Sequence, residues 1–262
     1  MKQKTSKSLS KLFAMFLVIL TLIVSLHSES YAKTKKKEFL IGGFIGLSSI
    51  SSCSTSRYIV FAGLPPIKKT SKIYNKFIVF DKKTHKLNSF KVGTNAGGKF
   101  TVKGKYIYYK KSNYINRISI NGKNNKKIVK IGKGNQFCGL NNNRLYYCKN
   151  DIYYSCKLNG LNLRKEKLKN DNICRISTIS SKKAKILGPG LGNIIKVKTK
   201  KNNKTKTLAS NGYFTYSLSG DWVLYVSSTV NEDGKEIGDG NYGVFAVRYD
   251  GKYKTKILEN DF

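Results

Sequence analysis

The sequence predicts an all-β fold, a β-propeller of about five four-stranded blades that follows an N-terminal signal helix. The first observation behind this prediction is a pattern of aromatic and β-branched segments that recurs about every 39 residues. The second is that each repeat continues into another strand, a polar turn and a short lysine-rich strand. No helical pattern of appreciable length follows residue 32. The residues that open the repeats are Arg57, Lys105, Arg144, Lys183 and Asp221, at intervals of 48, 39, 39 and 38 residues.

The clearest repeat covers residues 105–129. Its segment 106–109 is aromatic and β-branched, which suits a pleated, half-buried surface, and residues 114–120 alternate between apolar and polar types. Asn121 and Gly122 then predict a type I′ hairpin turn, in which both central residues have positive φ. Residues 126–131 predict a lysine-rich outer strand, because charge on an edge strand discourages pairing with other chains.

Four short strands at a period of ~40 residues are typical of a propeller blade. A β-sandwich with evenly spaced strands is the alternative, but a sandwich has no reason to repeat its hairpin chemistry at so constant an interval. In a propeller, we expect the blades to pack through the apolar residues of the aromatic strands, which are Ile59, Phe61, Ile107, Tyr109, Leu145, Tyr147, Ile186, Val223 and Tyr225.

These repeats also resemble a known family. Tyr-Ile-Tyr-Tyr at 106–109, a next strand that ends in Asn-Gly or Asp-Gly, and then Lys-x-x-x-Leu/Ile are similar to the low-density-lipoprotein-receptor-like β-propeller domain of unknown function in secreted bacterial proteins. The resemblance covers residues 50–258 and is carried by 106–131, 144–168 and 221–258, less by 57–92 and 183–208. It implies a propeller. It brings no catalytic residues, because the role of that family is itself unassigned.

Residues 1–32 are predicted to be a secretory signal peptide. Four lysines precede the apolar stretch 12–26, and Ser30-Tyr31-Ala32 offers a cleavage site. The apolar stretch is short for a membrane span, which needs about 20 residues, so an uncleaved anchor is the alternative. The predicted domains are therefore the signal at 1–32, a basic and apolar segment at 33–47, and the propeller at 48–262.

Cys53 ends an Ile-Ser-Ser-Cys sequence that is similar to a bacterial lipobox. Lipidation of Cys53 is therefore a hypothesis. Against it, a lipobox belongs to the first signal, and Cys53 falls inside the first strand of the first repeat. Membrane contact is expected only through a lipidated Cys53 or an uncleaved signal.

The charge of the chain favours anionic partners. Removing residues 1–32 takes four lysines and one glutamate from a chain with 50 basic and 14 acidic residues, which leaves a formal charge of +33. Such a field attracts anionic envelope polymers, lipid head groups or nucleic acid. Only six of the basic residues are arginine, and specific nucleic-acid recognition favours arginine forks. We therefore expect anionic envelope polymers, or another surface protein, rather than nucleic acid.

Four of the five cysteines, Cys138, Cys148, Cys156 and Cys174, fall in or near one repeat. Cys138 and Cys148 flank one hairpin and are the best pair for a disulfide. Buried thiols that act as small apolar residues are an equally good explanation. No CxxC spacing occurs, which disfavours a zinc site.

The sequence favours a secreted, cell-envelope-associated, non-enzymatic binding module with a strongly basic surface. The tyrosines proposed to bind a ligand are Tyr108, Tyr146, Tyr153, Tyr154 and Tyr242. The alternative is a glycosidase-like propeller enzyme, which would need paired carboxylates at one mouth of the channel. No such pair can be named from the sequence, and the single histidine after residue 32, His85, lies in a polar turn.

No cofactor is expected, with one exception to consider. Residues 231–241 are rich in oxygen ligands and glycine, which suits a hard cation such as Ca²⁺. Asp233, Glu236 and Asp239 are the candidate ligands. The spacing does not match an EF-hand, so a solvated hairpin tip is the alternative.

Overall fold

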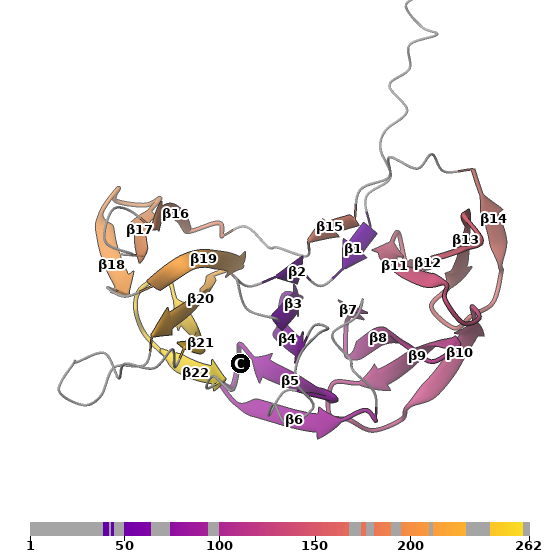
Figure 1. The fold of residues 1–262 in the computed structure, drawn as a ribbon. Coiled ribbons are helices and arrows are strands. Elements are labelled where there is room, and N and C mark those ends of the chain that lie inside the picture. The colour runs from indigo at the N-terminus through magenta and orange to yellow at the C-terminus, as the bar shows by residue number, and fades with distance from the viewer. Residues whose placement is uncertain are drawn as a thin grey trace, which may run out of the picture. The chain divides into compact units, whose positions relative to one another are not determined.

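A computed structural model of the chain describes residues 39–41, 43–44, 50–63, 74–93, 100–167, 174–176, 181–189, 195–209, 212–228 and 242–258. Residues 37–262 form one compact unit. Every regular element in the described residues is a β-strand, and Figure 1 shows the strands in chain order from indigo β1 to yellow β22. The predicted signal peptide lies outside these residues. Among the residues described, no helix is long and apolar enough to cross a bilayer.

The first and second sheets are antiparallel meanders, in which each strand pairs with the next along the chain. The first sheet contains β2 (Gly43–Phe44), β3 (Ile50–Ser54), β4 (Tyr58–Gly63), β5 (Lys76–Asp81) and β6 (Leu87–Lys91). The second contains β7 (Phe100–Lys103), β8 (Tyr106–Lys111), β9 (Tyr114–Ser119) and β10 (Lys126–Lys130).

The third sheet has a four-stranded meander and two further strands beside it. The meander is β11 (Gln136–Asn141), β12 (Arg144–Lys149), β13 (Ile152–Lys157) and β14 (Arg164–Glu166). Next to β11 lie β1 (Phe39–Ile41) and, parallel to β1, β15 (Cys174–Ile176). The segment 33–47, predicted to precede the propeller, thus supplies β1 to this sheet and β2 to the first sheet.

The fourth and fifth sheets complete the series. The fourth contains β16 (Ala184–Pro189), β17 (Ile195–Thr199) and β18 (Thr205–Ala209), and the fifth contains β19 (Gly212–Ser219), β20 (Trp222–Ser228), β21 (Tyr242–Arg248) and β22 (Thr255–Leu258). The fourth sheet therefore has three strands, because β15, expected there from the repeat, pairs with β1 instead. With this exception, the predicted series of five propeller blades is confirmed.

The core lies in layers between neighbouring sheets. One cluster joins the fifth sheet to the first, a second joins the first to the second, a third joins the second to the third, and a fourth joins the fourth to the fifth. All nine residues predicted to pack the blades together are at most 9% exposed. Each large aliphatic or aromatic side chain buried in this way contributes about 1.5–3 kcal/mol, so these layers hold the blades in place.

The repeat also fixes how consecutive sheets approach each other. In three of the sheets, the glycine in the turn after the third strand lies against the outer strand of the preceding sheet. A Cβ added to Gly122 would lie 2.7 Å from Phe90, and a Cβ added to Gly160 would lie 2.2 Å from the Ile128 carbonyl oxygen. A Cβ added to Gly251 would lie 2.8 Å from Lys206. At Gly122 and Gly160 a side chain does not fit at such distances, whereas the atoms near Gly251 belong to the flexible end of Lys206 and can move. The glycines of the two Asn-Gly pairs are thus needed for contact between blades.

The type I′ turn predicted at Asn121-Gly122 is wrong. Of these two residues only Gly122 has positive φ, and its N–H donates to the Ser119 carbonyl while the Ser119 N–H donates to the Lys123 carbonyl. This is a type I turn followed by a left-handed glycine bulge. Two-residue turns with both φ values positive occur elsewhere, at Asn142-Asn143 and at Asn150-Asp151.

Candidate basic pocket

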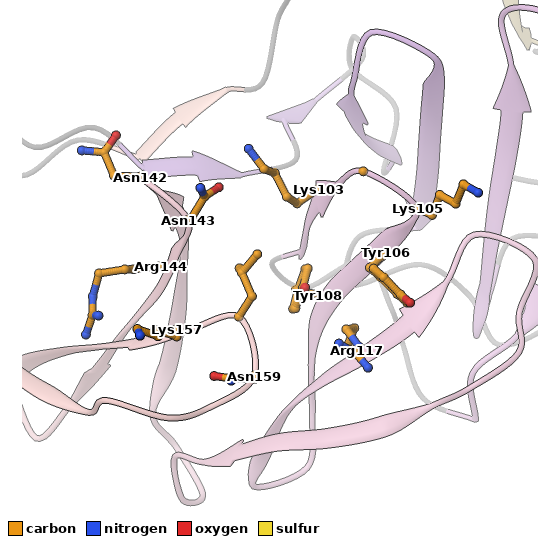
Figure 2. Close-up of a pocket in the computed structure, with 12 residues that line it drawn as sticks. Lys103, Lys105, Tyr106, Tyr108, Arg117, Asn142, Asn143, Arg144, Lys157 and Asn159 are labelled. Atoms are coloured by element: carbon orange, nitrogen blue, oxygen red, sulfur yellow. The ribbon is translucent and has the colours of Figure 1, made fainter.

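A pocket of about 780 Å³ lies between the second and third sheets. We call it the basic pocket, because five of its lining residues carry positive charge and none is an aspartate or a glutamate. Figure 2 shows side chains from both sheets around it. Its lining residues are Lys103, Gly104, Lys105, Tyr106, Tyr108, Arg117, Asn142, Asn143, Arg144, Lys157, Leu158 and Asn159.

The lining residues gather because hairpin turns of the two sheets meet there. Gly104, with φ +58°, turns the chain from β7 into β8, and it places a lysine on each side of itself. In the third sheet, Asn142 and Asn143 make the turn from β11 to β12 with φ values of 44° and 59°, a conformation that asparagine tolerates well. Lysines and asparagines at these turns are exposed, so the pocket opens to solvent.

Arg117 lines the pocket from the second sheet and is less exposed than the three lysines there. It lies on β9 beside β8, half-buried, with its guanidinium 4.4 Å from the centre of the Tyr106 ring. The Nε atom of Arg117 is buried and has no hydrogen-bond partner among the described residues. Burial raises the pKa of the adjacent Tyr108 hydroxyl, an effect that a hydrogen bond with Arg117 and its positive charge oppose. Figure 2 shows the three side chains together on the second-sheet side.

Arg144 is held by its own sheet. Its Nε donates to the Ser155 hydroxyl at 2.8 Å, and its terminal nitrogen donates to the backbone carbonyls of Ser155 and Asn162 at 3.1 and 2.6 Å. Ser155 in turn donates to Glu166. The Arg144 guanidinium is therefore fixed away from the pocket, and it contributes charge at the rim rather than free donors.

A second, smaller hollow of about 290 Å³ lies at the opposite end of the second sheet. Lys127 covers the Tyr114 ring there at 4.8 Å, and the Lys111 ammonium donates to the Val92 carbonyl at 2.7 Å. The lysines that line it have partners within the chain, which makes the basic pocket the better candidate site.

The tyrosines predicted to bind a ligand do not gather in one place. Tyr108 lines the basic pocket but is only 2% exposed. Tyr146 and Tyr153 pack with Cys138 and Cys148 on another face of the third sheet. Tyr154 stacks on Tyr147 with ring centres 5.5 Å apart. Tyr242 begins β21, and its side chain lies outside the described residues.

The predicted metal ligands Asp233, Glu236 and Asp239 also lie outside the described residues. Within the part of the chain that the structure describes, no group of three potential metal ligands occurs. Cys53 lies on β3 in the core between the first two sheets and is 1% exposed. Lipidation of this thiol would therefore have to precede folding. Cys138, Cys148 and Cys156 are thiols in this structure.

Three aspartates near hairpin turns, Asp81, Asp221 and Asp250, are paired with cations. Arg57 forms a forked pair with Asp81, Lys183 contacts Asp221 at 3.0 Å, and Arg248 pairs with Asp250. Burial raises the pKa of Asp81, but hydrogen bonds from Arg57 and two backbone N–H groups outweigh it and lower the pKa overall. A general acid of a glycosidase needs the opposite shift.

Sequence reasoning missed the basic residues of this pocket. The signal that would have found Arg117 is a comparison of the second strands of the repeats, aligned on the aromatic strands. Tyr106 pairs with Ser119 and Arg144 pairs with Lys157, so Arg144 corresponds to Tyr106. The residue that opens the third repeat is therefore Asn143, not Arg144 as predicted. With that register, an arginine stands alone at a position that is small or apolar in the other sheets.

Comparisons with known proteins give no family. No family model matches the chain, and no curated protein matches it. Solved structures that resemble it include an oligogalacturonate lyase in complex with manganese, with a TM-score of 0.34 and 7% identity over 86% of this chain and 75% of that chain. A streptogramin B lyase matches with a TM-score of 0.32 and 13% identity over 80% of this chain and 83% of that chain. Another is the Neurospora crassa Pan2 WD40 domain, with a TM-score of 0.31 and 12% identity over 81% of this chain and 64% of that chain. The chain spans 59% of the chain that it matches in an S. cerevisiae complex of Dbp5, Nup159 and Gle1 (0.33, 11%). No activity follows from likenesses of this size, and the fold assignment rests on the sheet topology.

Proposed function

We propose that the chain is a secreted or cell-envelope-associated, non-enzymatic binding module for anionic envelope polymers of a bacterium. The single observation that carries the proposal is the basic pocket, in which five cations and three asparagines line about 780 Å³ with no carboxylate among them. An acid-free basic lining repels cations and favours an anionic ligand. The resemblance of the repeats to the low-density-lipoprotein-receptor-like propeller domain agrees with such a location, and membership in that family is part of the proposal.

The polymer is preferred over a small neutral sugar because of where the cations lie. Lys103, Lys105 and Lys157 are exposed at turns around an open pocket, so they can contact successive charged groups of one chain. Their contribution is largely electrostatic and is screened within ~8 Å at physiological salt. Binding should accordingly be weak for each contact, additive along a polymer and sensitive to ionic strength.

The test is a pull-down of the protein on purified cell wall across a salt series. We expect bound protein to fall by about 100-fold or more between ~0.05 and ~0.5 M salt, as counterion release requires for several charge contacts. Binding that survives high salt and is competed by a neutral oligosaccharide would refute the electrostatic account, because stacking and neutral hydrogen bonds depend little on salt. Capture that requires a wall protein would instead identify another surface protein as the partner.

A further inference from the structure

Arg117 occupies a register position that the other sheets fill with small or apolar side chains. The position is defined by strand pairing. In each sheet, Tyr106 or its equivalent is counted as the first residue of the aromatic strand, and the position is the residue of the next strand that pairs with the third. The residues at this position are Val79, Arg117, Ser155, Val197 and Ala246, which pair with Val60, Tyr108, Tyr146, Ile186 and Leu224. The four residues other than Arg117 are at most 3% exposed. Only the second sheet places a charge there.

A guanidinium at this position is costly unless something compensates it. Arg117 is half-buried and its Nε is buried; burial of a charged group without a full set of partners is destabilising, and no carboxylate lines the pocket. The Tyr106 ring and the Tyr108 hydroxyl offset part of this cost. The buried Nε of Arg117 nevertheless remains without an acceptor among the described residues. The missing partner is an anion.

We propose that Arg117 is the principal ligand of a phosphate subsite in the basic pocket. This inference rests on the proposed function and names the chemical group that the pocket takes: a phosphoryl group esterified to an alcohol or a sugar. The planar fork of arginine donates two parallel hydrogen bonds to phosphate oxygens. Lys103, Lys105 and Lys157 add point charges around it, and Asn143 and Asn159 offer amide donors.

Phosphate fits this donor set better than carboxylate. A carboxylate presents two oxygens in one plane, which a single arginine fork can satisfy. A phosphate diester presents oxygens in several directions, and donors here come from two sheets and three turns. The volume of about 780 Å³ lies within the range for ligands of drug size. The pocket therefore holds the phosphate together with the unit to which it is esterified.

The test is titration calorimetry of the full-length chain and the Arg117→Val variant with sn-glycerol 3-phosphate. Valine is chosen because Val79 and Val197 stand at the same register position, so the variant should fold and be at least as stable as the wild type. We expect its affinity to fall by about 10- to 100-fold, the effect of losing a charge-assisted pair of hydrogen bonds. Arg117→Lys, which keeps the charge but loses the fork, should fall between the two.

Lys126→Val is the matched control. Lys126 is the exposed neighbour of Arg117 in the ladder between β9 and β10 and does not line the pocket. Lys126→Val removes a charge of the same sign from the same sheet. Because Lys126 does not line the pocket, the substitution should change the affinity by less than about threefold. Equal losses in Arg117→Val and Lys126→Val would overturn the subsite, since the effect would then be one of net charge alone.

Further probes separate the ligand chemistries. Glucuronate should bind at least about tenfold more weakly than sn-glycerol 3-phosphate, and glycerol should not bind. Equal binding of glucuronate would overturn the choice of phosphate. In the cell-wall pull-down, salt-sensitive binding that Arg117→Val leaves intact would keep the proposed function and overturn the subsite. Arg117-dependent binding of sn-glycerol 3-phosphate without any cell-wall binding would keep the subsite and overturn the proposed polymer.

Discussion

Two junctions between sheets share one backbone register and differ in what fills them. At the junction of the fifth and first sheets, Trp222 is 4% exposed and packs against Phe80 at 4.9 Å. At the junction of the second and third sheets, the equivalent of Trp222 is Tyr106, which is half-buried and carries Arg117 over its ring. Both junctions have an apolar layer, but the second also contains the basic pocket. We call the first, in which Trp222 is buried, the closed junction.

The cations at the two junctions also differ in their hydrogen-bond partners. Lys82 in the first sheet donates to the Thr55 carbonyl at 2.5 Å and to the Ser219 hydroxyl of the fifth sheet at 3.0 Å. The residue that is equivalent to Lys82 at the basic pocket is Leu158. Lys82 thus has acceptors within the chain, whereas Arg117 has a buried N–H without an acceptor among the described residues. In a repeat protein, the position that departs from its own repeats is a strong indicator of a ligand site.

The largest expected effect comes from placing arginine in the closed junction. Ala246 corresponds to Arg117 in register, is 0% exposed and packs with Trp222 and Leu224. Ala246→Arg must bury an uncompensated charge and overpack the layer, so we expect it to lower the free energy of unfolding by more than about 4 kcal/mol. Urea unfolding followed by Trp222 fluorescence measures it.

Ala246→Met separates the two causes. It adds comparable length without a charge, and it should cost about 1–3 kcal/mol by overpacking alone. If Ala246→Arg were as stable as the wild type, the register position would tolerate arginine in any sheet. Arg117 would then need no ligand to explain it, and the comparison between the junctions would lose its meaning.

The next effect concerns the contact that brings the second and third sheets together. Gly160 has φ +88°, and a Cβ there would lie 2.2 Å from the Ile128 carbonyl oxygen of β10. Gly160→Ala should lower the free energy of unfolding by about 2–4 kcal/mol, from the left-handed backbone and the displaced strand together. It should also weaken ligand binding, because the turn that carries Asn159 would shift. Thermal and urea unfolding measure the first effect, and calorimetry measures the second.

Gly134→Ala is the control for the backbone part of this effect. Gly134 has φ +80°, and nothing lies within 4 Å of a Cβ placed there. It should cost only about 1–2 kcal/mol, the steric price of the left-handed region. Equal losses in the two variants would show that Gly160 is needed for its left-handed turn and not for its close approach to Ile128.

Much of the fold could be predicted from the sequence, because the strands of each repeat are indicated by local residue patterns. The aromatic and β-branched segment at 106–109 and the outer strand at 126–130 behave as predicted, one buried and the other exposed. The departures arise where partners are distant. β15 leaves the fourth repeat because it pairs with β1, more than 130 residues earlier. No local pattern specifies that pairing.

The candidate site was harder to predict than the fold. The sequence favours five tyrosines as ligand residues, yet Tyr108 lies in the core between the second and third sheets. Asn121-Gly122 predicts a turn type from the sequence, whereas the close contact of Gly122 with the preceding sheet becomes visible only in three dimensions. Arg117 belongs to a strand that alternates between apolar and polar residues, and its departure from the other sheets becomes visible only once the pairing of the second strand with the aromatic strand is known.

The smallest effect is a pH dependence at the closed junction. Burial lowers the pKa of Lys82 to about 8, from an ordinary value of 10.5, and Asp221 opposes the shift only in part. Between pH 8 and 10.5 the unfolded chain therefore binds the proton more tightly than the folded chain does. By linkage, the contribution of Lys82 to stability rises with pH across this window and is lost as the pH falls through 8.

The measurement is the difference in unfolding free energy between the wild type and Lys82→Met at pH 7, 8, 9 and 10. Other groups titrate equally in both proteins, so the difference isolates Lys82. We expect it to move in favour of the wild type by about 1–2 kcal/mol over this range, less than the full shift implies because solvent screens a side chain at this depth. Lys83→Met removes an exposed lysine from the same turn, and its difference from the wild type should stay level. A level difference for Lys82→Met as well would mean that the ammonium is solvated. The first and fifth sheets would then be joined by their apolar layer alone, and the closed junction would owe nothing to the acceptors around Lys82.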